Sequence, residues 1–128
     1  MDASDAIRAR IPTFPGYANE KGRRLCDELV RSYVGEAVAE VSARLDQGMS
    51  DRVGSLLMRA GFINQSAFTG FENAKIGDDA ITRLLVCDLT LCTLAEKGSK
   101  ISPNDFDAWI SRIESSLDVR DSIMRASG

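Results

Sequence analysis

One aspartate in an apolar stretch is the residue whose type and position most clearly suggest chemistry. Residues 79–97 show the 3.6-residue periodicity of a helix, and their apolar side chains span roughly 220° of its circumference at 100° per residue. Asp88 lies in the middle of that arc, so its carboxylate is expected to be cut off from bulk water. A buried carboxylate needs a partner, or its pKa shifts. The pattern predicts a central helix with one charged group facing the core.

Two interpretations of Asp88 follow from its position. The functional one is an acid with a raised pKa in a pocket, or one ligand of a cation. The structural one is an internal salt bridge, or a hydrogen bond to the open backbone of a turn such as residues 61–77. No second acid lies three or four residues away, which removes the simplest paired-carboxylate mechanism. We favour the structural interpretation, because ion pairs that only hold a fold also perturb pKa values.

Aromatic residues supply the second candidate. Three of the five phenylalanines lie close together in a glycine-bearing segment: Phe62, Phe68 and Phe71. Such residues serve either as anchors for a partner or as a plug over the end of a helical core. Phe68 and Phe71 are three residues apart and can share a helix face. The plug is favoured, but these three residues and Asp88 are the candidate binding residues of the chain.

The composition excludes most catalytic centres. The chain has no histidine, which rules out a Ser-His-Asp or Cys-His site within it and any zinc site that needs imidazole. The three cysteines, Cys26, Cys87 and Cys92, have no CxxC spacing and lie in apolar helical patterns, so they are expected to be free thiols in a reducing compartment. Phosphate-binding and nucleophile-elbow motifs are absent, and residues 94–106 lack the first ligand of a calcium loop. We expect no enzymatic activity, no metal and no cofactor.

Basic residues near the N-terminus are the nearest approach to a nucleic-acid surface. They are Lys21, Arg23 and Arg24, with Arg8 and Arg10 earlier in the chain, in a protein of net charge −3. Such a cluster is more often the solvated start of a helix than a binding face. A nucleic-acid partner is therefore not expected.

Helical periodicity dominates the chain, and no segment alternates with period two for long enough to predict a sheet. We expect an all-α fold, a single-domain bundle of five or six helices over residues 1–128. Residues 1–18 are expected to form an extended arm packed on the bundle, because Pro12 and Pro15 disfavour helix before them. The helices are expected at 19–47, 50–60, near 65–74, at 79–97 and from 103 onward, where the last one either continues to the end or is followed by a short final helix.

Two glycines and a tryptophan have predicted positions. Gly35 falls on the polar side of the first long helix, and Gly98 ends the helix at 79–97. Ser102 and Pro103 form a strong start signal for the next helix. Trp109 belongs to its narrow apolar stripe and is expected to be buried.

Three functions remain open at this level. The first is a non-enzymatic protein–protein interaction or regulatory module, whose partner is another protein or a second copy of the chain. The second is a carrier of a small apolar ligand held between helices with Asp88 as its polar contact. The third and least favoured is a helix-turn-helix regulator using residues 98–103, because the helix that follows offers Asp105 and Asp107 with only Arg112. No signal peptide or membrane-length apolar run is present, which predicts a cytoplasmic protein.

Overall fold

Helices make up the regular structure of this chain. The computed structural model describes residues 2–46, 50–61, 68, 70–71 and 74–127. Within them the structure is all-α and has no strand, which confirms the predicted fold class. The α-helices are α1 (Ala3–Arg10), α2 (Glu20–Arg44), α3 (Asp51–Gly61), α5 (Asp78–Lys97) and α6 (Phe106–Ser127), and two 3₁₀ turns, η1 (Gly98–Lys100) and η2 (Pro103–Asp105), precede α6.

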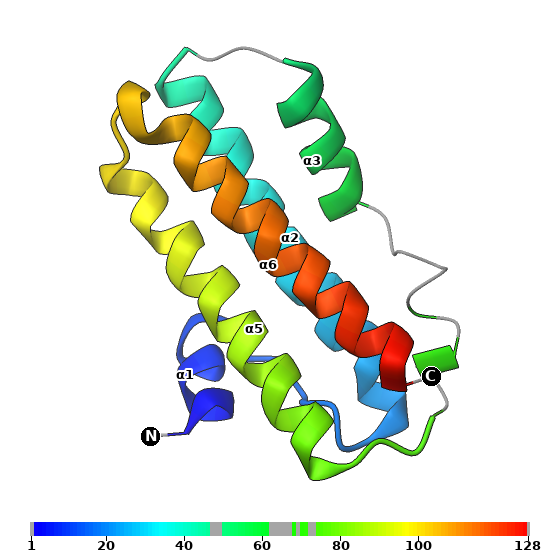
Figure 1. Cartoon of the computed structure of the whole chain (residues 1–128). Helices are drawn as coiled ribbons and strands as arrows, with labels where there is room; N and C mark the ends of the chain where they lie inside the picture. Colours follow the sequence, from blue (N-terminus) through cyan, green and yellow to red (C-terminus); the bar gives the residue numbers. More distant parts are fainter. Residues whose placement is uncertain (1, 47–49, 62–67, 69, 72–73, 128) are drawn as a thin grey trace.

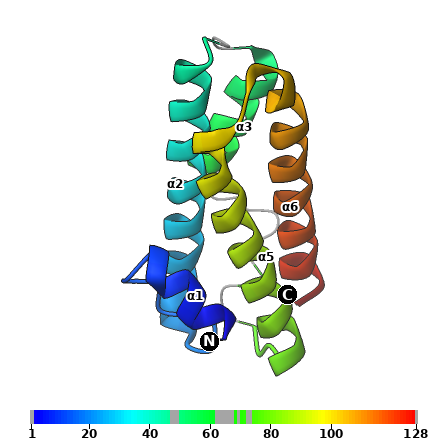
Figure 2. The same ribbon diagram turned by 90° about the vertical axis from the view of Figure 1, so that its left-hand side faces the viewer.

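Three long helices form the body of the bundle. Figure 1 shows α5 and α6 side by side, antiparallel and joined at one end by η1 and η2, with α2 passing behind α6. In the view turned by 90°, α5 stands between α2 and α6, and it packs against both of them (Figure 2). The shorter α3 flanks α2, and α1 lies against α5.

The N-terminal arm differs from its prediction. Residues 3–10 were expected to be extended, but they form α1, whose N-cap Asp2 accepts a hydrogen bond from the amide of Asp5 at 2.9 Å. An acidic N-cap stabilises a first helical turn, and Ile7 gives this short helix one fully buried anchor. Pro12 and Pro15 prevent helix only after Arg10, where α1 ends. From there the chain makes a turn, in which the amide of Phe14 donates to the carbonyl of Ile11 at 3.0 Å, and it continues without regular structure to Asn19. This segment buries three apolar side chains, Ile11, Phe14 and Tyr17.

The first long helix begins as predicted and ends earlier. Asn19 caps α2 by accepting from the amide of Lys21 at 3.0 Å, and the helix ends at Arg44, three residues before the expected end at Gln47, which lies outside the described residues. Leu25 falls within the apolar arc in a helical projection of α2, but its side chain is 43% exposed.

The expected polar face of α2 is partly an interface. Arg31 and Ser42 lie opposite the apolar arc in a helical projection of α2, yet both are buried. A Cβ on Gly35 would lie 3.0 Å from the Cβ of Ala60, so the glycine allows close approach of α3 rather than sitting in solvent. Because α3 covers this side of α2, the buried arc is wider than the apolar pattern alone indicates.

A tight joint connects α5 to α6. Trp109 is 2% exposed, as predicted, and its indole N–H donates to the carbonyl of Leu94 at 2.7 Å. A Cβ on Gly98 would lie 2.7 Å from Val41 and 2.9 Å from the indole ring. Pro103 begins the turn that leads into α6. This helix continues to Ser127 without interruption, so the last helix is not followed by a separate short one within the described residues. This joint holds α5 and α6 in a fixed register.

Gly98→Ala should lower the free energy of unfolding by about 1–3 kcal/mol, because the added methyl group overpacks the joint between Val41 and Trp109. Gly61→Ala is the matched control, since nothing lies within 4 Å of its Cβ position. That variant should be neutral or more stable by up to about 1 kcal/mol. Thermal melts of both variants check this, and equal melting temperatures would contradict the close packing at Gly98.

Candidate functional site

Asp88 lies in a buried ion pair. Its side chain is 0% exposed at the centre of the bundle. Oδ1 accepts a hydrogen bond from Nε of Arg120 at 2.8 Å, and Oδ2 accepts one from the hydroxyl of Tyr17. The partner is therefore a guanidinium on α6 and a phenol on the N-terminal arm, and no turn from residues 61–77 contributes one among the bonds described. Both carboxylate oxygens are occupied.

Arg120 connects this pair to α2. Its guanidinium is 1% exposed and donates from Nη1 to Asp27 and from Nη2 to the hydroxyl of Tyr17 at 3.1 Å. The other oxygen of Asp27 accepts from Nε of Arg31 at 2.8 Å. We call Tyr17, Asp27, Arg31, Asp88 and Arg120 the interior network. Its two carboxylates and two guanidiniums carry equal and opposite formal charge.

The interior network shifts the pKa values of its members in directions that burial and pairing explain. Burial raises the pKa of Asp88, and Arg120 and Tyr17 offset only part of that rise. Burial raises the pKa of Tyr17 well above its usual value, so the phenol keeps its proton and donates it to Asp88. Burial lowers the pKa of Arg120, but Tyr17, Asp88 and Asp27 outweigh this effect and keep the guanidinium charged.

A second layer of ion pairs closes the network from solvent. Arg59 on α3 pairs with Asp121 and Asp118 on α6, each at 2.9 Å. Between this layer and the interior network lies a cavity of about 10 Å³, lined by residues that include Asp27, Arg59 and Asp121. Such a space holds about one water molecule. This cavity is too small for an organic ligand.

Aromatic rings fill the region beside Tyr17. Phe68 and Phe71 are 1% and 0% exposed, and Phe62 lies outside the described residues. Phe14, Tyr17, Phe71 and Phe68 form a chain of edge-to-face contacts with centroid separations of 5.8, 6.0 and 5.7 Å. Buried rings in mutual contact form a core, so the two described phenylalanines of the candidate set hold the arm to the bundle.

The basic cluster is used inside the molecule. Arg23, predicted to be a solvated residue, is 3% exposed and donates to the carbonyls of Tyr17, Phe71 and Ala74. Its partners are carbonyls of two separate chain segments, which the sequence pattern could not bring together.

Two further basic side chains near the N-terminus have partners within the protein. Arg24 lies over the ring of Phe68 at 5.4 Å, and Arg8 donates to the carbonyl of Phe14 at 2.9 Å. Both side chains remain exposed at the surface.

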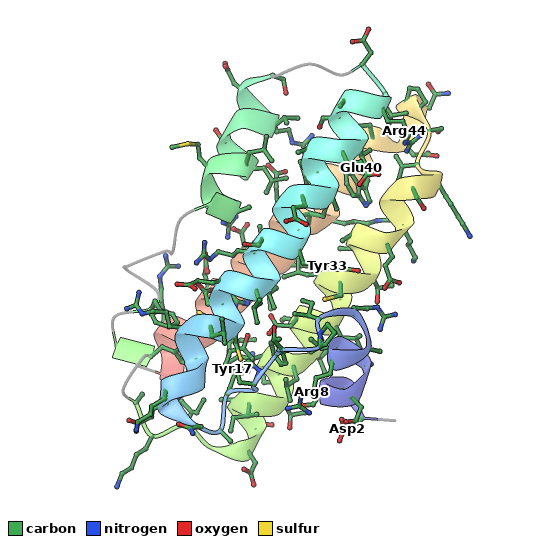
Figure 3. All side chains as sticks on the ribbon, turned by 180° about the vertical axis from the view of Figure 1, so that it is seen from behind. Asp2, Arg8, Tyr17, Tyr33, Glu40 and Arg44 are labelled. Carbon is green, nitrogen blue, oxygen red and sulfur yellow. The ribbon has the colours of Figure 1, made fainter. Side chains whose placement is uncertain are left out.

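Two shallow grooves mark the surface. One, of about 350 Å³, lies between α5 and α6 and is lined by Leu94, Arg112 and hydroxyl side chains. The other, of about 200 Å³, lies between α2 and α5. We call it the α2–α5 groove and define it by its lining: Tyr33, Glu36, Ala37, Glu40, Ala95 and Glu96. Figure 3 shows Tyr33 and Glu40 on the side of α2 that faces α5.

The α2–α5 groove is acidic. Within the described residues, no ion pair involves Glu36 or Glu40, and both side chains are exposed. Glu96 pairs with Arg10 of α1. Burial, and then the charge of Glu96, raise the pKa of Tyr33, so its phenol stays neutral. Carboxylates over a floor of two alanines favour a cationic guest.

Sequence reasoning missed Arg120 and Asp27, although a signal existed. Arg120 follows Ile113 and Leu117 on the same face of α6, and Asp27 lies beside Cys26 one turn before Val30. Each charged residue thus occupied a position of the buried stripe. The α2–α5 groove had no comparable signal, because its residues come from helices that only the tertiary structure places together.

The described part of the chain offers neither a cluster of metal ligands nor a helix that could cross a membrane. No group of three or more His, Cys, Asp or Glu side chains there is arranged to hold a metal ion. None of the helices seen there combines the length and the hydropathy that a membrane crossing requires.

Asp88→Leu should lower the free energy of unfolding by about 3–5 kcal/mol, because it leaves a donor of the buried Arg120 and the phenol of Tyr17 without an acceptor. Arg120→Leu should cost a similar amount. The double variant should cost clearly less than the sum, since neither charge is then stranded. Denaturant unfolding of the four proteins measures this coupling, and strictly additive losses would show that the pair does not interact.

Stability should fall at alkaline pH through Tyr17. Its pKa in the folded protein is raised above the usual 10.0, so the unfolded chain releases this proton first as the pH rises. The stabilisation is complete below about pH 10 and is lost above it. Tyr17→Phe should flatten the fall in unfolding free energy above about pH 10, as measured by denaturant unfolding at a series of pH values. An unchanged slope would mean that this phenol ionises as freely in the folded protein as in the unfolded chain.

Comparison with protein-family models, curated proteins and solved structures finds no match for this chain. Its function is therefore argued from its own geometry.

Proposed function

We propose that this chain is a non-enzymatic interaction module that binds a segment of another protein bearing arginine or lysine in the α2–α5 groove. The observation that carries the proposal is a hollow of about 200 Å³ with two unpaired carboxylates, Glu36 and Glu40, on one wall. Complementary charge is what steers and orients such a partner.

The shape of the groove suits a side chain that lies along it. Ala37 and Ala95 are small, so a long aliphatic stem fits over them with its charge toward the carboxylates. Glu36 and Glu40 lie one helical turn apart on α2. At this spacing the two carboxylates can pair with two cations, or one guanidinium can pair with either of them. Each exposed pair contributes at most about 1 kcal/mol, so we expect a weak, salt-sensitive interaction.

The interior network supports a role without catalysis. Asp88, the one candidate acid in an apolar environment, has both oxygens bonded to other side chains of the protein. The same geometry disfavours the apolar-ligand carrier, which needs Asp88 as a free polar contact and a pocket of about 300 Å³ or more. The helix-turn-helix alternative is disfavoured because η2 and the first turn of α6, which would approach DNA, expose the two acids Asp105 and Asp107.

A reducing compartment such as the cytoplasm is part of the proposal. The three cysteines are free, and two of them, Cys26 and Cys92, are buried. Burial raises the pKa of each of these two thiols to about 12. Thiols of this kind behave as small apolar side chains and do not call for an oxidising environment.

The binding test uses a labelled arginine–serine repeat peptide and fluorescence anisotropy at low and at physiological ionic strength. Glu36→Gln with Glu40→Gln should weaken binding about three- to tenfold, because two carboxylates of the groove are lost. The matched control is Glu20→Gln with Glu28→Gln, which removes the same charge from the same helix outside the groove. That control should bind almost as tightly as the natural sequence.

Three outcomes would contradict the proposal. The first is an absence of saturable binding at low ionic strength. The second is equal weakening in the two double variants, which would indicate attraction to net charge alone. The third is self-association, measured by sedimentation, that the groove variant weakens while the peptide does not bind, because the partner would then be a second copy of this chain.

A further inference from the structure

We propose that Arg10 of α1 is an internal competitor for the α2–α5 groove and lowers its affinity for a cationic partner. This inference rests on the proposed function and adds its regulation. The carboxylates of Glu36 and Glu40 on α2 are then available to a partner, whereas the carboxylate of Glu96 on α5 is paired with Arg10.

Arg10 makes the contact that a partner would make. Its Nε donates to Oε1 of Glu96, and its Nη2 donates to Oε2 at 3.3 Å, so the guanidinium engages both carboxylate oxygens. The remaining nitrogen, Nη1, donates to the carbonyl of Ala6 at 2.8 Å, which fixes the side chain against its own helix. The surface therefore already holds one guanidinium in a two-point geometry.

Arg10 can leave Glu96 without unfolding the arm. The helix α1 is anchored by Ile7, which is 0% exposed, and the arm after it by Ile11, Phe14 and Tyr17. The guanidinium contributes nothing to that apolar anchor, and the side chains of Arg10 and Glu96 are 27% and 42% exposed. An exchange of the internal cation for an external one therefore needs only a rotation of side chains.

The neighbouring arginine does not compete. Arg8 lies in the same helix, but its guanidinium donates to the carbonyls of Phe14 and Pro15 and shapes the arm. It has no contact with the residues that line the α2–α5 groove among those described. Competition is thus specific to Arg10, the last residue of α1.

The experiment measures the affinity of the arginine–serine peptide for Arg10→Gln and for Arg83→Gln. Arg83 is an exposed residue of α5 outside the groove, so both variants remove one positive charge. Arg10→Gln should tighten binding about two- to fivefold, which is the range of one exposed ion pair. Arg83→Gln should tighten it much less, and Arg10→Lys should lie between Arg10→Gln and the natural sequence, because lysine keeps the charge and loses the two-point contact.

The possible results separate the two proposals. If the natural protein binds the peptide through Glu36 and Glu40 but Arg10→Gln matches Arg83→Gln, competition is wrong and the binding function stands. If none of the variants binds, the binding function is wrong and its regulation with it. A lowered melting temperature for Arg10→Gln, with binding unchanged, would assign the ion pair to stability alone and also overturn competition.

Discussion

A guanidinium buried in the middle of a helical bundle is the constraint on which this structure depends. Removing Arg120 from water costs several kcal/mol unless every donor is bonded and its charge is balanced. Three donors reach Asp88, Asp27 and Tyr17, and Arg31 balances the second carboxylate. The charge of this interior is thus cancelled by partners inside the protein.

These partners come from four parts of the chain, so the network constrains how the parts fit together. Tyr17 belongs to the arm, Asp27 to α2, Asp88 to α5 and Arg120 to α6. Sliding any one of these helices by a turn would strand a charge in the core, which apolar contacts alone would not penalise as strongly. The apolar stripes therefore favour a bundle, and the polar network selects one register within it.

The contrast between interior and surface is what gives the proposed function its location. Inside, each carboxylate of the network has a bonded cation and the space beside it admits about one water molecule. In the α2–α5 groove, Glu36 and Glu40 are exposed and have no ion pair in the described chain, while Glu96 has one with Arg10. Charge that is already compensated stabilises the fold, whereas uncompensated charge beside a hollow can attract a partner.

Local patterns by themselves determined that this chain is all-α and where α2, α3 and α5 begin, to within a residue. They also determined that Trp109 is buried and that Asp88 faces the core. These features could be predicted because caps and helical periodicity depend on residues a few positions apart. They missed α1 because Pro12 and Pro15 disfavour helix only for the residues just before them, whereas the prediction extended this effect to all of residues 1–18. Only the tertiary structure decided that Arg120 is the partner of Asp88, that Gly35 faces α3 and that Arg23 joins two segments, because each contact links residues distant in the chain. The α2–α5 groove belongs to this second group, since its shape depends on how closely two helices pack, and a helical pattern carries no information about that distance.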